Sequence, residues 1–244
     1  MAPPGANQKL HTMVHTLLTT LLLITSLSAS AQKGLYTAAQ EWPVKITDGW
    51  FTAKTISYGP YTTVDRKNGI AAGAAADFIK NPTSPFNFSV VGNDTKVLVQ
   101  EISAITISFS NYSLPAFLEN MPSTAPFLYV RINWNSYNDT VPFNPSETLT
   151  HWELILKAPT YLELNDDKPV GVLREDGKEK FRITAHNNFG KKNSYENICY
   201  EFHYRRKEIA AVIPGEKPRV WVNPDVPEEL RPILAAAIGA LLLR

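Results

Sequence analysis

Apolar and polar residues alternate along most of the chain after Trp42, in short runs that turn residues separate. Alternation with a period of two places every second side chain on one face of an extended strand. About twelve strands are predicted, at residues 44–46, 50–58, 61–64, 86–91, 96–102, 127–134, 149–157, 170–174, 179–184, 200–204, 208–213 and 219–222. The alanine-rich residues 70–77 fit a short helix and a strand equally well. The pattern predicts a mainly β protein.

The clearest local signal is a hairpin around Asp176 and Gly177. The runs on either side, 170–174 and 179–184, both alternate, and an Asp-Gly pair tolerates the positive φ angles of a tight turn. We expect the two runs to pair as neighbouring antiparallel strands.

The chain ends on an apolar segment, because residues 233–243 contain no polar side chain and only Arg244 follows. Asp225 has the position and chemistry of a helix cap, and acidic residues follow it in the first turn. We therefore predict a helix over residues 226–243. Pro232 either kinks this helix or lies in the first turn of a helix that restarts there.

Three roles could explain such a helix: a membrane anchor, a partner-binding helix, or a helix enclosed by the rest of the chain. A membrane span needs about 20 apolar residues, and the wholly apolar run is shorter. An interfacial helix would have a charged face, which residues 233–243 lack. A helix that is apolar on every side belongs in a protein core. The pattern favours the enclosed helix, with a tail anchor and a partner-binding helix as alternatives.

These features predict a single large antiparallel barrel or sandwich of about twelve strands, with the apolar C-terminal helix packed inside it. This order resembles the Tubby-like architecture, which Tubby domains, phospholipid scramblases and plant LURP-one-related proteins share. The resemblance is one of strand order and composition over residues 149–244. It implies a closed barrel around a central helix, and a protein that interacts with lipid or a membrane.

The beginning of the chain has the pattern of a secretory signal peptide. An apolar run at residues 17–27 follows a weakly basic stretch and precedes the small residues 28–31. We expect cleavage after Ala31, which leaves residues 32–244 as a single β-rich domain that includes the C-terminal helix. Translation could begin at Met1 or at Met13. The predicted protein is exported, and would be periplasmic, associated with the cell envelope, or secreted.

The predicted mature chain is electrically balanced. The leader holds one of the 24 basic residues, Lys9, and no acidic residue, so 23 of each remain. Such a chain has no overall field that would attract nucleic acid. No nucleic-acid partner is predicted, and a lipid or an envelope component is the partner class that stays open.

Cys199 is the only cysteine, so the chain has no internal disulfide. Strand alternation places Cys199, Glu201 and His203 on one face. Catalytic use of this thiol is one interpretation, but no nucleophile signature surrounds it, and free cysteines in strands are commonly packed residues. We predict a buried or half-buried structural cysteine.

The remaining sequence signals for a metal site or a catalytic site are weak. The histidines His151, His186 and His203 lie on different segments without the spacing of metal ligands. Neither a G-x-S-x-G motif nor a phosphate-binding glycine loop occurs. Aspartates at positions 166, 167 and 176 could bind calcium, but their setting is typical of residues that form turns. No catalytic residue, metal site or cofactor is predicted.

Two basic clusters are the remaining candidate site for an anion. They are Lys191 with Lys192, and Arg205 with Arg206 and Lys207. Solvated loop charge is the plain interpretation, and binding of an anionic group by guanidinium groups is the functional one. The clusters flank the predicted strand 200–204, so we expect them at its opposite ends rather than in one patch.

The sequence favours an exported, non-catalytic binding or structural protein whose ligand the sequence does not identify. A lipid-interacting barrel of the Tubby-like kind is the alternative. An exported hydrolase is a more remote one.

Overall fold

The computed structural model describes residues 34–49, 52–69, 79–107, 116–118, 127–134, 150–191 and 194–244. The predicted leader at residues 1–31, the segment 70–77 and Lys192 lie outside the described residues.

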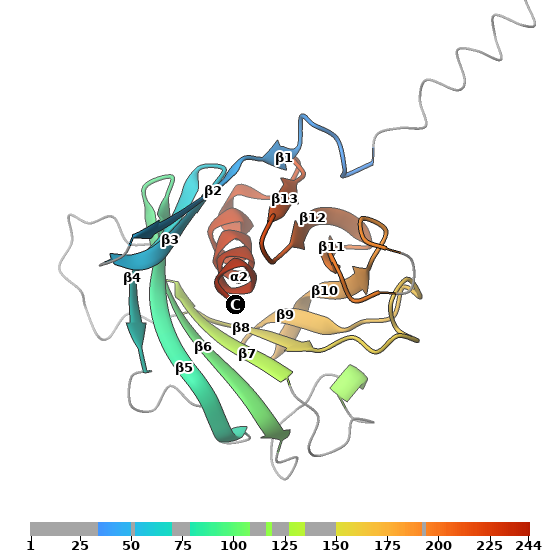
Figure 1. Ribbon diagram of the computed structural model, residues 1–244, viewed down its shortest axis with the longest axis horizontal. Helices are drawn as coiled ribbons and strands as arrows, with labels where there is room; N and C mark the ends of the chain where they lie inside the picture. The colour runs from blue at the N-terminus through green and yellow to red at the C-terminus, as the bar shows by residue number, and fades with distance from the viewer. Residues whose placement is uncertain are drawn as a thin grey trace, which may run out of the picture.

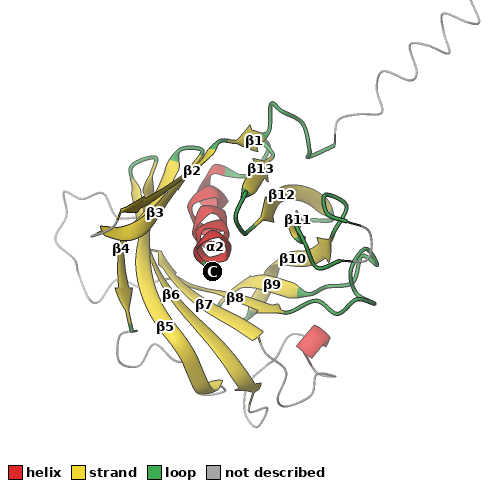
Figure 2. Cartoon of the chain, in the orientation of Figure 1, coloured by secondary structure: helices red, strands yellow, loops and turns green. Residues whose placement is uncertain are grey.

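Thirteen antiparallel strands form one sheet that curves into a nearly closed barrel within the described residues (Figures 1 and 2). The strands are β1 Glu41–Trp42, β2 Val44–Gly49, β3 Thr52–Tyr58, β4 Tyr61–Asn68, β5 Ile79–Gly92, β6 Thr95–Ile107, β7 Phe127–Trp134, β8 Thr150–Lys157, β9 Gly171–Glu175, β10 Lys178–His186, β11 Cys199–Tyr204, β12 Lys207–Ile213 and β13 Arg219–Val222. From β2 to β13 each strand pairs with the next one in the chain. The prediction of a mainly β barrel is confirmed.

The two edges of the sheet meet through the backbone. Strand β1 pairs with β13 at one edge and β2 pairs with β3 at the other, and only Pro43 separates β1 from β2. The Gly59 amide donates to the Pro43 carbonyl at 3.3 Å. Gly59 has a φ of 53°, and a Cβ there would lie 2.4 Å from the Trp42 ring. The turn beside the junction therefore requires glycine.

The twelve predicted runs each overlap a strand, and β1 is the additional one. Two residues before a proline give no alternation to detect, so β1 was not predicted. Strand β5 also begins earlier than the predicted run 86–91, at Ile79. Ser84, with a φ of 48°, and a register shift between Thr83 and Phe86 interrupt its alternation there.

The C-terminal helix α2, Arg231–Leu243, lies inside the barrel (Figure 1). All twelve residues from Pro232 to Leu243 are buried, and the helix contacts strands on several sides, including β3, β5, β7 and β12. The Tyr58 hydroxyl on β3 donates to the Ala235 carbonyl at 2.7 Å. The prediction of an enclosed helix is confirmed. Within the described residues, no helix has the length and apolar character that a membrane crossing requires.

The start of the helix differs from the predicted one. A single 3-10 turn, η3 Glu228–Leu230, comes first, and α2 begins at Arg231 with Pro232 in its first turn. Asp225 does not cap the helix; its amide donates to Asn223 Oδ1 at 2.9 Å in a local turn. The Arg231 guanidinium instead donates to the Pro224 carbonyl at 2.8 Å and so ties the preceding turn to the helix. The proline sets the start, because its missing amide needs no partner in a first turn.

A carboxyl side chain, that of Glu101, points into the interior of the barrel. Glu101 on β6 pairs in register with Phe86 and Val130, which both belong to the core around the helix. Glu101 is 1% exposed, and its Oε2 has no hydrogen-bond partner in the described structure. Burial raises the pKa of this carboxyl to about 8, although the charges of Arg244 and Arg66 act to lower it.

A second, smaller apolar cluster lies on the outer face of the barrel. It consists of Leu35, Cys199, Ala211, Ile213 and Trp221, with Tyr36 and Phe189 packed against it. Leu35 and Tyr36 come from the segment that precedes β1, so this segment covers the outside of β11, β12 and β13. A short η2 helix, Ala116–Leu118, contributes a buried Leu118 elsewhere.

Candidate functional site

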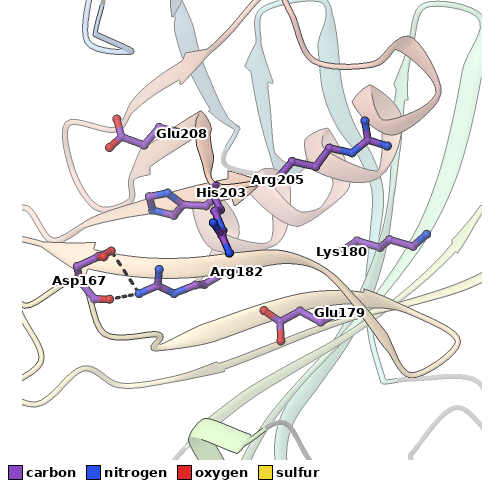
Figure 3. Close-up of a pocket in the computed structure, with 8 residues that line it drawn as sticks. Asp167, Glu179, Lys180, Arg182, His203, Arg205 and Glu208 are labelled. Carbon is purple, nitrogen blue, oxygen red and sulfur yellow. Dashed lines mark hydrogen bonds and ion pairs between the residues drawn. The ribbon is translucent and has the colours of Figure 1, made fainter.

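A polar groove of about 650 Å³ lies over the outer face of β10, β11 and β12 (Figure 3). We call it the outer groove. Its lining residues are Asp167, Glu179, Lys180, Arg182, His203, Arg205, Arg206 and Glu208. Four of these side chains are cationic and three are carboxylates.

Two features of the local sequence build the outer groove. Alternation along β10 places Lys180 and Arg182 on one face, and antiparallel register sets Arg182 opposite His203. The turn from β11 to β12 is formed by Arg205 and Arg206, whose φ angles are 49° and 67°. Left-handed φ angles at both central residues are the geometry of a tight hairpin turn. This turn places Arg205 and Arg206 in the lining of the groove.

The charges of the outer groove are unequally neutralised. Arg182 donates to the Asp167 backbone carbonyl and lies 3.2 Å from its Oδ1, and Figure 3 shows the two side chains turned toward each other. Lys180 lies 3.2 Å from Glu175 Oε2. Among the described residues, neither Arg205 nor Arg206 forms an ion pair. The Arg205 guanidinium lies 5.1 Å from the centre of the Tyr204 ring. Arg205 and Arg206 are therefore groove cations that no described carboxylate neutralises.

A hydrogen-bonded cluster continues from His203 beneath the covering segment. We call it the Glu201 cluster; its members are Tyr36, Thr184, His186, Glu201 and His203. The Thr184 hydroxyl donates to Glu201 Oε2 at 3.2 Å and lies 2.8 Å from His203 Nε2. The Tyr36 hydroxyl donates to Glu201 Oε1. His186 Nε2 lies 3.2 Å from the same carboxylate oxygen.

The hydrogen bonds around His186 indicate which of its two ring nitrogens carries the hydrogen. The Asn188 amide donates to His186 Nδ1 at 3.2 Å, so Nδ1 presents a lone pair. The hydrogen of the neutral ring is then on Nε2, which lies 2.8 Å from the Tyr36 oxygen. His186 and Glu201 therefore form a hydrogen-bonded pair and not an ion pair between two full charges.

The environment of Glu201 keeps this carboxyl ionised. Burial acts to raise its pKa, but hydrogen bonds from His186, His203 and Tyr36 outweigh burial and hold the pKa well below its usual range. Burial also raises the pKa of the Tyr36 phenol, which stays protonated and donates.

Cys199 is fully buried between the barrel and the covering segment, as predicted for a packed thiol. It shares the outer face of β11 with Glu201 and His203. Burial raises the pKa of the Cys199 thiol to about 12. The thiolate, which is the nucleophilic form, is therefore disfavoured at neutral pH.

The predicted anion-binding residues separate as expected from strand geometry. Lys191 lies in the loop between β10 and β11, at the end of β11 opposite to Arg205 and Arg206. Arg205 and Arg206 line the outer groove, whereas Lys207 is exposed at the start of β12 and does not. Sequence reasoning missed Lys180 and Arg182, and it considered Asp167 only as a calcium ligand or a turn residue. Alternation along residues 178–186 could have placed the first two on one face.

The acidic turns behave as turn formers. Asp167 and Asp176 have φ angles of 46° and 45°, and Asp166 lies 2.7 Å from Lys168 Nζ. In the part of the chain that the structure describes, no three His, Cys, Asp or Glu side chains are grouped so that they could hold a metal ion.

Comparisons with protein-family models, curated proteins and solved structures found no match to this chain.

Proposed function

We propose that this protein is an exported, non-catalytic binding protein that holds an anionic ligand in the outer groove. The observation that carries the proposal is the β11–β12 turn, which presents Arg205 and Arg206 to a groove of about 650 Å³. Planar guanidinium groups bind phosphate and similar oxyanions through paired charge-assisted hydrogen bonds.

Two observations support the other parts of this proposal. Export is supported by the signal-peptide pattern of residues 1–31, and intact-mass measurement of exported protein that begins at Gln32 would test it. The absence of covalent chemistry is supported by Cys199, whose thiol is buried and protonated at neutral pH. Activity-based probes for serine and cysteine hydrolases should leave the purified protein unlabelled, and specific labelling that Cys199→Ala removes would contradict this part.

The second candidate is a Tubby-like protein that binds the headgroup of an anionic lipid. It is supported by the barrel that surrounds α2, which has the arrangement that the resemblance implies. Both candidates share one ligand chemistry, an anionic oxygen group at Arg205 and Arg206, but they differ in whether the group is free or part of a membrane.

Binding of the protein to two probes separates these sources. The probes are inorganic phosphate, followed by isothermal titration calorimetry, and vesicles of neutral lipid with and without phosphatidylserine, followed by co-sedimentation. The double variant Arg205→Gln/Arg206→Gln should weaken binding at least about tenfold, because each charge-assisted hydrogen bond contributes about 1.5 to 3 kcal/mol.

Matched controls are Lys191→Gln and Lys207→Gln, which remove a basic residue near either end of β11 without touching the outer groove. They should bind like the unaltered protein. Phosphate binding without vesicle binding favours a free ligand, and the reverse favours a lipid. Equal binding by the double variant and the unaltered protein would refute the role of the outer groove.

A further inference from the structure

The segment that leads into β1 is joined to the barrel by little backbone pairing. We take this covering segment as residues 34–41, which reach β1 beside β13 (Figure 1). The Val222 amide donates to the Gln40 carbonyl at 2.9 Å, and Glu41 pairs in register with Trp221. The amides of Gln40 and Glu41 donate to a carbonyl within the segment itself. A segment with few bonds to the rest of a fold can open at a lower free energy than global unfolding requires.

The side chains of Leu35 and Tyr36 hold the covering segment on the outer face of the sheet. Leu35 is 4% exposed and belongs to the outer apolar cluster. The Tyr36 hydroxyl donates to Glu201 Oε1 and lies 3.7 Å from Cys199 Sγ. The Tyr36 ring meets the Trp221 ring edge-on, with the ring centres 5.2 Å apart. Tyr36 therefore covers both the thiol and the carboxylate of β11.

Trp42, the residue that follows the covering segment, belongs to a different part of the fold. It packs against the core around α2, and its ring centre lies 5.8 Å from that of Tyr61. The contacts of Leu35 and Tyr36 are instead with the outer cluster. Departure of the covering segment would therefore leave Trp42 and the inner core in place.

The face beneath the covering segment continues into the outer groove. Cys199, Glu201 and His203 alternate along β11 on its outer face, and His203 lines the groove. The Thr184 hydroxyl donates to Glu201 Oε2 at 3.2 Å and lies 2.8 Å from His203 Nε2, so it links the covered and open parts of this face. Cys199, at the far end, is fully buried.

The closed arrangement also leaves a polar group without a partner. Trp221 is 1% exposed, and its Nε1 has no hydrogen-bond partner among the described residues. A buried N–H group that lacks a partner disfavours the closed state. The surface beneath Tyr36 is partly polar, because Glu201 and His186 lie there, and water can replace their hydrogen bonds to the segment. Exposure of this face therefore costs less free energy than exposure of the inner core.

We propose that the covering segment is a lid that opens while the barrel stays folded, and that its opening extends the outer groove along β11 from His203 to Cys199. The lid thus controls how much of the outer face of β11 a ligand or solvent can reach. This inference concerns access to the face and does not depend on which ligand the groove binds.

Labelling of Cys199 with Ellman's reagent tests the lid on the full chain, because Cys199 is the only cysteine and lies at the covered end of the face. The labelling rate is measured in increasing urea, and global unfolding is followed in parallel by circular dichroism. A local opening exposes little surface, so its rate changes little with urea, whereas global unfolding has a steep dependence. We expect a slow labelling rate that stays nearly constant below the unfolding transition.

A second thiol shows whether the barrel stays folded. The double variant Cys199→Ala/Val130→Cys moves the only thiol to the inner face, where Val130 is fully buried in the core around α2. This thiol should be labelled only through global unfolding, with the full urea dependence. Equal rates and equal urea dependence for the two thiols would overturn the inference.

Tyr36→Phe should increase the rate most. It removes the hydroxyl that donates to the Glu201 carboxylate and keeps the ring. Hydrogen bonds to charged groups are among the stronger ones in proteins, so we expect Cys199 to be labelled about tenfold faster or more, still with little dependence on urea.

Glu41→Gln provides a milder change with a matched control. Glu41 accepts hydrogen bonds from Arg219 at 2.8 and 3.0 Å, and its side chain is 34% exposed. Its loss should increase the labelling rate about two- to fivefold, as expected for an exposed ion pair. Glu175, which pairs with Lys180 away from the covering segment, is 32% exposed. Glu175→Gln should leave the rate unchanged.

Three results would overturn the lid. The first is a Cys199 labelling rate that rises with the full urea dependence of global unfolding, or no labelling below the transition. The second is an unchanged rate in folded Tyr36→Phe and Glu41→Gln variants. The third is an increase in Glu175→Gln as large as that in Glu41→Gln. These measurements involve no anion, so their outcome is independent of the proposed anion-binding function.

Discussion

Glu101 and Glu201 are both secluded carboxyl groups, one inside the barrel and one on its outer face, and their pKa values shift in opposite directions. Glu101 lies among core residues with Oε2 unpaired, and burial raises its pKa to about 8. Glu201 is also subject to burial, but hydrogen bonds from His186, His203 and Tyr36 hold its pKa well below the usual range. The difference is one of partners, because a carboxylate removed from water needs donors to remain charged.

The comparison shows how the two faces of one sheet are used. The inner face packs against α2, and Glu101 Oε2 has no hydrogen-bond partner there within the described residues. The outer face of β10 and β11 has Thr184, His186 and His203 around Glu201, and this arrangement orients side chains at the edge of the outer groove. The polar residues on the outer face are therefore candidates for a binding role. Glu101, in contrast, is an isolated carboxyl group among core residues.

The largest expected effect on stability comes from removing helix α2, which packs against the inner face of the sheet. Deletion of residues 233–244 should abolish cooperative unfolding, since six buried Leu and Ile side chains contribute on the order of 10 kcal/mol and net stabilities are about 5 to 15 kcal/mol. Leu241→Asp should do nearly the same through a buried unpaired charge, because Leu241 is 1% exposed. Calorimetric melting would measure both.

The matched control for the charge is Leu162→Asp, at a position that is 79% exposed. It should change the midpoint little. A deletion variant that melts cooperatively at the full-length temperature would contradict the account of α2 as the core of the barrel.

Glu201→Gln should have the next largest effect, a loss of about 2 to 4 kcal/mol at pH 7, because a charge that accepts several hydrogen bonds is removed. The folded pKa of Glu201 is lowered, so its contribution is present above the ordinary value of 4.5 and is lost as the pH falls below it. The difference between variant and unaltered protein should shrink in acid. Urea denaturation at several pH values would measure it, with the exposed Glu208→Gln as control.

Gly239 in α2 tests how closely the helix and barrel fit. A Cβ there would lie 2.6 Å from the Tyr58 hydroxyl oxygen. Gly239→Ala should therefore destabilise by about 1 to 3 kcal/mol, although alanine is the better helix former. Tyr58→Phe, which removes that oxygen, should lose about 1 kcal/mol alone. The double variant Gly239→Ala/Tyr58→Phe should lose less stability than the sum of the losses in the two single variants. Strictly additive losses in denaturation experiments would refute the contact.

Glu101→Gln should have a smaller effect on stability, and it should stabilise the protein rather than destabilise it. The folded pKa of about 8 exceeds the ordinary 4.5, so the carboxyl favours unfolding increasingly as the pH rises from 4.5 to about 8. The neutral amide avoids this penalty. We expect little change near pH 4.5 and a gain of about 1 to 3 kcal/mol at pH 8.5. Denaturation of Glu196→Gln, at an exposed position, should show no such trend, and a Glu101→Gln variant that is less stable at pH 8.5 would contradict the prediction.

The sequence predicts the barrel well because the signals for its strands and turns lie in short local stretches of the chain. Alternation locates the strands, and the hairpin at Asp176 and Gly177 forms with φ angles of 45° and 78°. The apolar run at the C-terminus favours the enclosed helix over a tail anchor or a partner-binding helix, because it is short for a membrane span and apolar on every side. Its exact start was not predicted, since Asp225 satisfies a local turn instead of the helix.

The outer groove was predicted only in part. Arg205 and Arg206 are visible as a charge cluster, but Arg182 joins them only through the register that sets it opposite His203. That register depends on how the chain between β10 and β11 folds, which no local pattern reveals. Tyr36 reaches Glu201 from 165 positions away in the chain, and such a contact has no sequence signature. Glu101, in contrast, falls on the same face as Val97 and Val99, so alternation alone could have marked it as an inward carboxyl.

The most direct test of the contrast between the two carboxyl groups is a carbon-13 NMR titration of protein labelled at the glutamate side-chain carboxyl, with Glu101→Gln and Glu201→Gln used to assign the two signals. The account predicts that the Glu101 signal titrates near pH 8, and that the Glu201 signal stays in its ionised position at pH values well below 4.5. Titration of Glu101 near 4.5, or of Glu201 at or above 4.5, would contradict the claim that hydrogen bonds to Glu201, and the unpartnered Oε2 of Glu101, separate these two groups.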